Sequence, residues 1–340
     1  MKSSKTLQVK FPVALTIPYA FIYLLIYLLI LENVAKSDWI QDKYPLRRLG
    51  ISHYQFEWKI SNLDALVRAQ GEIDCIFVGS SLVVRGIAPK VISESYKEET
   101  GKDISCFNFG VDSMKMPSAE YIIPFLYERY HPRVIVFGIS PREFNREDDE
   151  SFEPIVGSDW FQYQLGNFSW KGLAYSNSYA YQYLITWKSK NTDDNWQLIE
   201  DIGDKMGFLG FNPLDVEFDP NLINVGIKAL RQFKVFNRTL KKFEKILDLD
   251  GNDVEIILLE MPVTSRYTNF LKGGQKRYNR FFNQIENLAF SRGIPFIRTN
   301  NPREIPNRYF IDTHHLNLKG AVLLSNLLAE ELANILEVEK

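Results

Sequence analysis

Short apolar runs alternate with longer amphipathic segments along this chain, and this alternation constrains its fold more than any other feature. The apolar runs have the length of buried strands, and the segments between them have helical periodicity. The expected strands are residues 74–78, 104–109, 134–138, 254–259 and 295–298. The expected helices are residues 88–100, 117–130, 222–247, 269–292 and 318–336. This order of elements predicts a parallel sheet covered by helices on both faces.

The size and charge of the chain limit the number of its domains and the partners that it can attract. Its 340 residues, 45% of them hydrophobic, can bury one substantial core with an insertion or two modest domains. Forty basic residues against forty-two acidic ones leave a formal net charge of -2. A chain so balanced has no overall field to attract nucleic acid, so no nucleic-acid partner is expected.

One uncharged stretch near the N-terminus has the length of a membrane span. Residues 11–31 contain no charged side chain, and 21 residues of helix reach about 31 Å, the thickness of a bilayer core. A buried core helix is the weaker alternative. Because no Ala-x-Ala-like cleavage site follows, the stretch is expected to be an uncleaved signal anchor, with residues 1–10 in the cytoplasm. The chain is therefore expected to be a single-pass protein of the cell membrane whose remaining domain is extracytoplasmic.

The region after the span is expected to contain a connector, a domain and an insertion. Residues 32–72 read as a connector with an amphipathic helix at about 55–70, and residues 73–340 as the α/β domain. Residues 145–252 interrupt the alternation. This segment is rich in aromatic residues, which could stack on sugar rings, although a packed cap is the favoured interpretation.

Neither a metal nor an organic cofactor is predicted. Cys75 and Cys106 fall in strand-like runs, where neighbouring parallel strands seldom offer disulfide geometry, so both are interpreted as small buried hydrophobes. The isolated His53 and His131 form no metal-binding spacing with them. No Gly-x-Gly-x-x-Gly follows the first strand, which disfavours a dinucleotide-binding enzyme.

Polar residues gather where the expected strands end. Residues 79–81 follow the first strand, 108–110 end the second, 138–142 end the third, and 312–315 lie beyond the fifth. Because the carboxyl ends of parallel strands meet at one edge of a sheet, these residues are expected to form one site. An acid three residues before a histidine, as in Asp312-Thr-His-His315, can orient the imidazole for chemistry.

These motifs resemble the SGNH (GDSL-like) hydrolase superfamily. The first block of that superfamily appears as Gly79-Ser80-Ser81-Leu82, and its last block, Asp-x-x-His, as Asp312 to His315. With the membrane anchor and the pair Ser140-Pro141, the chain looks most like the membrane-anchored branch that includes the D-alanyl-lipoteichoic acid transfer protein and alginate-type O-acetyltransferases. The resemblance covers residues 73–144 and 253–337. It implies a three-layer α/β/α, flavodoxin-like fold of SGNH type.

The resemblance also implies roles for individual residues. Ser81 would be the nucleophile, His315 the general base and Asp312 the group that orients it. The backbone N–H groups of Ser81 and Gly110 would stabilise the oxyanion.

The chain departs from the superfamily in its third block. The matching position reads Gly138-Ile139-Ser140 instead of Gly-x-Asn, so one oxyanion donor is missing. Asn108, Ser140 or Arg142 could replace it, and Arg85, Ser140 and Arg142 could contact substrate.

Less specific interpretations of the same residues stay open. Ser80 or Ser81 could cap a helix, and either His314 or His315 could be the base.

The expected function is a serine esterase or, given the anchor, an O-acyltransferase that modifies a cell-envelope glycan or related acylated polymer beside a multi-pass membrane partner. The rival hypothesis is a catalytically inactive member that binds glycan or scaffolds an envelope-modification complex.

Overall fold

A parallel sheet forms the centre of the protein. The structure is a computed structural model that describes residues 13–44, 46–145, 152–192, 207–219, 222, 230–251, 253–299 and 305–338. Its strands are β1 (Cys75–Gly79), β2 (Cys106–Gly110), β3 (Val134–Ile139), β4 (Glu255–Glu260) and β5 (Phe296–Ile297). The described strands pair in parallel in the order β2-β1-β3-β4-β5, the doubly wound order of flavodoxin-like folds.

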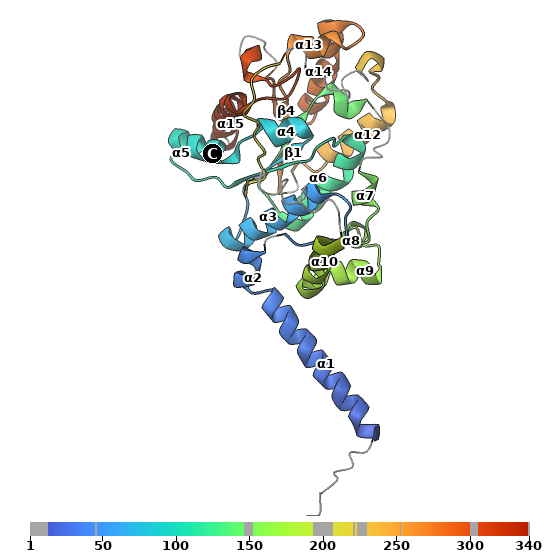
Figure 1. The fold of residues 1–340 in the computed structure, drawn as a ribbon. Coiled ribbons are helices and arrows are strands. Elements are labelled where there is room, and N and C mark those ends of the chain that lie inside the picture. The colour runs from blue at the N-terminus through green and yellow to red at the C-terminus, as the bar shows by residue number, and fades with distance from the viewer. Residues whose placement is uncertain are drawn as a thin grey trace, which may run out of the picture.

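Helices cover both faces of the sheet, because alternate residues of each strand face opposite cores. In β1, Ile76 and Val78 belong to one hydrophobic cluster, whereas Cys75 and Phe77 belong to the other. The first cluster is completed by α3 (Tyr54–Gln70), α6 (Met116–Tyr130), α12 (Asn237–Leu247) and α14 (Gly274–Phe290). The second is completed by α4 (Ser81–Gly86), α5 (Pro89–Thr100) and α15 (Leu318–Val338). The predicted three-layer α/β/α fold is confirmed (Figure 1).

Two predicted helices begin later in the chain than expected. The helix expected at 222–247 is wrong in its first part: Leu222 is irregular, Leu230 begins a short 3-10 turn, and α12 starts only at Asn237. Phe233, in the irregular stretch, packs its ring edge-on against Phe281 of α14, and the two ring centroids are 5.6 Å apart. This residue therefore makes a core contact instead of continuing a helix. Residues 223–229 lie outside the described part of the chain.

The helix expected at 269–292 is present as the single helix α14, but it begins only at Gly274. The short helix α13 (Ser265–Asn269) precedes it, and the chain turns between the two helices at Gly273 and Gly274, with φ of 103° and 54°. Left-handed backbone angles of this kind are readily adopted by glycine, and they end one helix direction before the next begins.

The region expected to be a connector contributes to the core in its second half. Leu63 and Phe56 of α3 are fully buried against the sheet. Lys59 of the same helix is also fully buried, and its Nζ donates to the carbonyl oxygens of Asn108 on β2 and of Gly210. The α/β domain therefore begins before residue 73, because α3 is one of the helices that cover the sheet.

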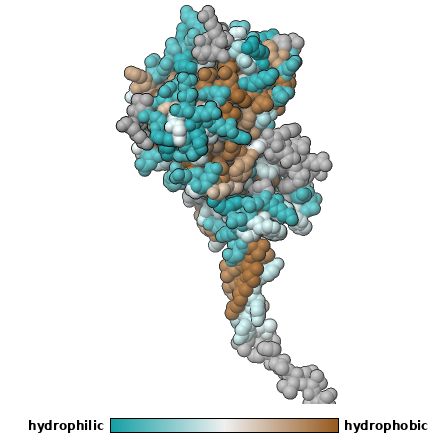
Figure 2. Space-filling model, turned by 90° about the vertical axis from the view of Figure 1, so that its left-hand side faces the viewer, coloured by the Kyte–Doolittle hydropathy of each residue, from teal (hydrophilic) through white to brown (hydrophobic). Residues whose placement is uncertain are grey.

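The N-terminal helix stands apart from the domain. Helix α1 (Val13–Ala35) projects below it (Figure 1), and the surface of its part next to the domain is strongly apolar (Figure 2). Residues Thr16–Lys36 are long and apolar enough to cross a membrane, a property that signal sequences share, and no residue of the apolar part of this helix is buried in the protein. Ala35, near its end, is buried. Side chains such as Ile17 and Tyr23 are about 70% exposed, at 71% and 69%. Contact between so much apolar surface and water would be strongly unfavourable, so the helix is suited to lipid.

The inserted segment separates into two parts. Its helices α7 (Glu153–Val156), α8 (Asp159–Gln164), α9 (Trp170–Asn177) and α10 (Tyr179–Thr192) pack at the end of the domain near α1 (Figure 1). Trp160 and Phe161 of α8 are buried against Phe56 and Phe125, so these two aromatic residues pack in the core.

The second part of the insertion, residues 207–219, crosses the domain as an extended strap. Its N–H and C=O groups pair with Asn108 of β2, Val84 of α4, Ile311 and Leu318. The strap therefore lies beside the elements that carry the predicted catalytic residues.

Cys75 and Cys106 are register partners on the neighbouring strands β1 and β2, and both are free and buried. They pack as small hydrophobic side chains, as predicted.

Candidate active site

Ser81 lies at the junction of β1 and α4. Gly79 ends the strand, Ser80 is the N-cap of α4, and Ser81 is the first residue of that helix. The side chain of Ser80 makes no capping hydrogen bond, and the Ser81 hydroxyl instead lies 2.9 Å from Nε2 of His315. The interpretation of Ser81 as a simple helix cap is therefore wrong for its side chain.

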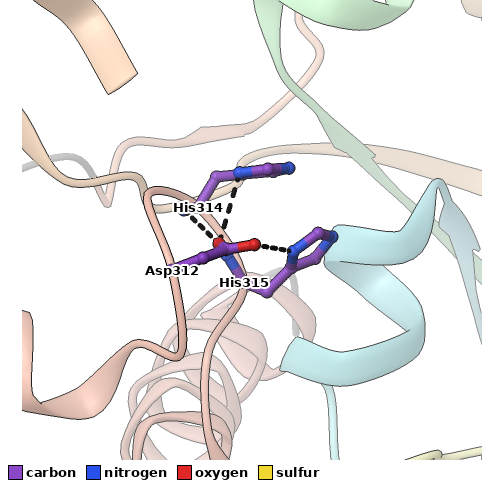
Figure 3. A group of neighbouring side chains, drawn as sticks. All are labelled: Asp312, His314 and His315. Atoms are coloured by element: carbon purple, nitrogen blue, oxygen red, sulfur yellow. Dashed lines mark hydrogen bonds and ion pairs between the residues drawn. The ribbon is translucent and has the colours of Figure 1, made fainter. Parts of the chain in front are cut away.

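The loop before α15 orients His315. Its Nδ1 lies 2.8 Å from Oδ2 of Asp312, and the backbone N–H groups of His314 and His315 both donate to Oδ1 of Asp312, each at 2.8 Å (Figure 3). Burial alone would raise the pKa of Asp312, but the hydrogen bond from His315 and the charges of the two histidines outweigh it and hold this pKa well below its usual range. Asp312 is thus a fixed carboxylate.

A second pair of hydrogen bonds fixes the position of this loop. The N–H and Oγ1 of Thr264, before α13, both donate to the carbonyl oxygen of Thr313, at 3.0 and 2.7 Å. The segment between β4 and α13 therefore fixes the loop on one side, and α15 continues from it on the other. This places His315 next to Ser81, although 234 positions separate the two residues.

The geometry separates the roles of the two histidines. The ring centroids of His314 and His315 are 4.0 Å apart, and Nδ1 of His314 lies 3.4 Å from Oδ1 of Asp312 (Figure 3). The same Nδ1 lies 3.0 Å from Oγ1 of Thr313. Burial, and then the charge of His315, lower the pKa of His314 well below its ordinary value. Of the two histidines, only His315 is hydrogen-bonded to the Ser81 hydroxyl. His315, the histidine of the Asp-x-x-His spacing, is therefore the one in the position of a base.

The predicted oxyanion donors Gly110 and Asn108 are engaged elsewhere. The N–H of Gly110 donates to Oδ1 of Asn108 at 2.9 Å, and Nδ2 of Asn108 donates to the carbonyl oxygens of Val83 and Ile87 at 2.7 and 2.8 Å. Asn108 is fully buried. In this geometry Asn108 ties β2 to α4, and neither predicted donor is available to an oxyanion.

Several backbone N–H groups at the same edge have no acceptor within the described part of the chain. They include those of Ser81, at the start of α4, and Ser113, in the loop after β2. Ser113 has φ of 67°, an angle that non-glycine residues seldom adopt and that is enriched at functional sites. Sequence reasoning missed Ser113, because no residue pattern indicates a left-handed serine.

The predicted substrate contacts differ in their surroundings. Ser140 is fully buried, and its N–H and hydroxyl both donate to Oε2 of Glu143 at 2.7 and 2.5 Å, closing a capping box over residues 141–144. Ser140 is therefore a structural residue here. Arg85 lies 3.6 Å from Asp112, and the charges of Arg85 and Arg142 both help to lower the pKa of His314, which places the two guanidinium groups near the site.

Glu143 belongs to a buried polar network that the sequence did not indicate. It is hydrogen-bonded to Ser140 and Ser80, and the Tyr267 hydroxyl lies 3.4 Å from that of Ser140. Burial raises the pKa of Glu143 despite the hydrogen bonds from the two serines. This network links the third strand end to the residue before Ser81. The only sequence signal for this network is the acidic residue Glu143, two positions after Pro141.

Potential ligand atoms for a metal also occur at this site. Ligand atoms of Asp312, His314 and His315 lie within 4.8 Å of one another. However, Asp312 and His315 already bond to each other, and a cation here would replace the hydrogen bond that orients the ring. The arrangement fits a proton-transfer pair better than a metal centre.

None of the comparisons with known proteins shows the function of this protein. No known protein family and no curated protein matches the sequence. Among solved structures, the chain is similar to a lipase/acylhydrolase from Enterococcus faecalis, with 11% identity, a TM-score of 0.37, and coverage of 77% of this chain and 96% of that one. It is also similar to an acetylxylan esterase from Geobacillus stearothermophilus, with 11% identity, a TM-score of 0.37, and coverage of 76% and 94%. Likeness at this level carries no argument about activity.

Proposed function

We propose that the protein is a membrane-anchored serine esterase or O-acyltransferase of the SGNH type, working through an acyl-serine intermediate. One observation carries this proposal: Ser81 Oγ, the His315 ring and the Asp312 carboxylate form a continuous hydrogen-bonded chain, with links of 2.9 and 2.8 Å. Serine, histidine and acid in this order of contact are the parts of a nucleophilic triad.

The acylation step follows from the positions of these atoms. Nε2 of His315 accepts the proton of Ser81 as Oγ attacks the carbonyl carbon of an ester. Asp312, bonded to Nδ1, keeps the ring oriented and stabilises the imidazolium that forms. The protonated Nε2 then gives its proton to the departing alkoxide, which leaves as an alcohol. The N–H groups of Ser81 and Ser113 are the proposed donors to the oxyanion.

The acyl acceptor decides between the two activities. Nε2 of His315 removes a proton from water in an esterase, or from a sugar hydroxyl in a transferase, and that oxygen takes the acyl group while Ser81 recovers its proton. The strap of residues 207–219 lies beside the site, where it can limit the access of water. The membrane helix supports a transferase that modifies an envelope glycan at the cell surface, beside a multi-pass membrane partner that supplies the acyl group.

A non-catalytic binding or scaffold function is the second candidate. It is favoured by the engagement of Gly110 and Asn108 with each other and by the absence of a third-block asparagine. An incomplete oxyanion site would suit a protein that retains the fold and binds glycan without transferring acyl groups.

A fluorophosphonate probe distinguishes these proposals, because it forms a covalent adduct only with an activated serine. We expect one adduct on the full-length protein in detergent, measured by intact mass. Ser81→Ala and His315→Ala should abolish it. The matched controls Ser80→Ala and His314→Ala should still form it at Ser81, since neither side chain bonds to the Ser81 hydroxyl. A folded wild-type protein without an adduct would support the binding function instead.

A further inference from the structure

A large apolar hollow lies where the membrane helix meets the domain. Its volume is about 970 Å³, and its walls come from α1, from α2 (Asp38–Lys43) and from α10. Leu28 and Leu31 of α1 line one side, and Leu184 and Trp187 of α10 line another. Because Leu28 and Leu31 belong to the uncharged span, the floor of the hollow lies at the depth of bilayer hydrocarbon.

The rim of the hollow has the composition of a membrane interface. Trp187 and Tyr44 line the hollow and are 67% and 52% exposed, and Trp39 of α2, beside Lys43, is 67% exposed. The ammonium group of Lys43 lies over the rings of both Trp39 and Tyr44, and Lys190 also lines the hollow. Aromatic rings beside lysines are typical of the level where headgroups meet hydrocarbon.

Contacts at the end of the span hold this surface in a fixed relation to α1. Glu32, directly after the uncharged stretch, accepts hydrogen bonds from the Ser178 hydroxyl at 2.8 Å and from the N–H groups of Tyr179 and Ala180 at 3.0 and 3.2 Å. Its carboxylate therefore caps the N-terminus of α10. Lys36 pairs with Glu32 at 3.2 Å and lies over the Tyr179 ring. Helix α10 is thus attached where α1 leaves the bilayer.

We infer that α2 and α10 rest on the membrane surface and that the hollow binds an acyl chain of a bilayer phospholipid, with Lys43 and Lys190 beside its headgroup. A flexible chain suits a concave apolar site that is continuous with hydrocarbon, whereas water there would leave apolar surface exposed. This surface is distinct from the catalytic residues, and the inference does not depend on the proposed activity.

Spin labels on the full-length protein in phospholipid nanodiscs test the location. The native thiols of Cys75 and Cys106 are 0% and 3% exposed and should not be labelled. Nitroxides at Leu184→Cys and Trp187→Cys should lose collisions with a water-soluble nickel chelate by about tenfold relative to Phe290→Cys, while retaining collisions with O₂, because hydrocarbon excludes the chelate. Phe290, on α14, is 84% exposed and serves as the control.

Two results of the spin-label experiment would overturn the inference. Nickel accessibility at positions 184 and 187 equal to that at 290 would place α10 in water. Protection from both O₂ and nickel would mean that protein, such as a second copy or a partner helix, covers the hollow.

A photoreactive lipid tests occupancy of the hollow. Phosphatidylcholine with a diazirine at the end of one acyl chain should crosslink to α10. Ala174 of α9 also lines the hollow, and filling the hollow with Ala174→Phe should reduce that crosslink several-fold without changing fluorophosphonate labelling of Ser81. Crosslinks confined to α1, or crosslinks to α10 that Ala174→Phe leaves unchanged, would reject the site even if the protein is an active hydrolase.

Discussion

At the scale of single residues, the site depends on hydrogen bonds that give each polar atom one role. Asp312 accepts from two backbone N–H groups through Oδ1, which leaves Oδ2 for the His315 ring. That bond leaves Nε2 for Ser81. The carboxylate therefore fixes both the tautomer and the direction of the ring.

Asp312→Asn tests this positioning role. The amide preserves the shape of the side chain but removes the charge that stabilises the imidazolium and allows the wrong tautomer, so kcat for an aryl acetate should fall by about 10⁴. Circular dichroism should show an unchanged fold. A loss smaller than about tenfold would mean that Asp312 does not act through His315.

At the scale of elements, α4 is seated directly on the sheet because glycines leave room for it. A methyl group on Gly79 would lie 2.7 Å from the carbonyl oxygen of Gly138 and would also collide with Val83 of α4. Gly138 likewise has no space for a side chain, since Val83 and Met261 fill it. These two glycines therefore let the first turn of α4, and Ser81 with it, approach the end of β1.

The strap is attached through a buried amine. Lys59 of α3 joins the carbonyl oxygen of Asn108, on β2, to that of Gly210, in the strap. Burial lowers the pKa of Lys59 to about 7, against the opposite effect of the Asp112 charge. The amine is therefore neutral in the folded protein above this pH, while it stays protonated in the unfolded chain up to about pH 10.

Lys59→Met should lower stability in a way that depends on pH. Two buried carbonyls lose their donor, at a cost of about 1–3 kcal/mol. Between pH 7 and 9.5 the unfolded wild-type chain holds more protons at this position than the folded one, so wild-type stability rises with pH, and the variant lacks this rise.

Thermal unfolding at pH 7, 8 and 9 measures the effect of Lys59. The difference in Tm between wild type and variant should grow with pH. Lys245→Met is the control, because that exposed lysine pairs with Glu120 on the surface and should give no such trend. A difference that is constant, or that shrinks with pH, would contradict a neutral buried amine.

At the scale of the whole molecule, the two parts of the insertion lie at different ends of the domain. The helices α7 to α10 gather near α1, whereas the strap runs past α4, Asn108 and the loop before α15 (Figure 1). Helix α4, with Ser81, lies in the half of the domain remote from α1 (Figure 1). The attachment of α10 to α1 therefore sets the position of the candidate site relative to α1.

Glu32→Ala should loosen this attachment. Without the carboxylate, the N-terminus of α10 loses its cap, and the distance between spin labels at positions 28 and 184 should become more broadly distributed in nanodiscs. Asp38→Ala is the control, since the Asp38 side chain is 82% exposed and pairs with Arg68. An unchanged distribution in Glu32→Ala would show that packing alone fixes the helix.

The sequence by itself determined the layers of the fold and the catalytic candidates. Strand and helix periodicity is a local property, so the order of elements, the placement of Ser81 at a strand end and that of Asp312 before the last helix were predictable from neighbouring residues. The spacing of Asp312 and His315 was predictable for the same reason, because both lie in one short loop.

Tertiary structure decided what depends on distant residues. The contact of His315 with Ser81, the hydrogen bonds of Asn108 to the carbonyl oxygens of Val83 and Ile87, and the split of the insertion all require atoms that only folding brings together. Helical periodicity also did not reveal that Phe233 would leave the helix for a core contact. In each case a long-range hydrogen bond or packing contact, invisible in local sequence, outweighs the local preference.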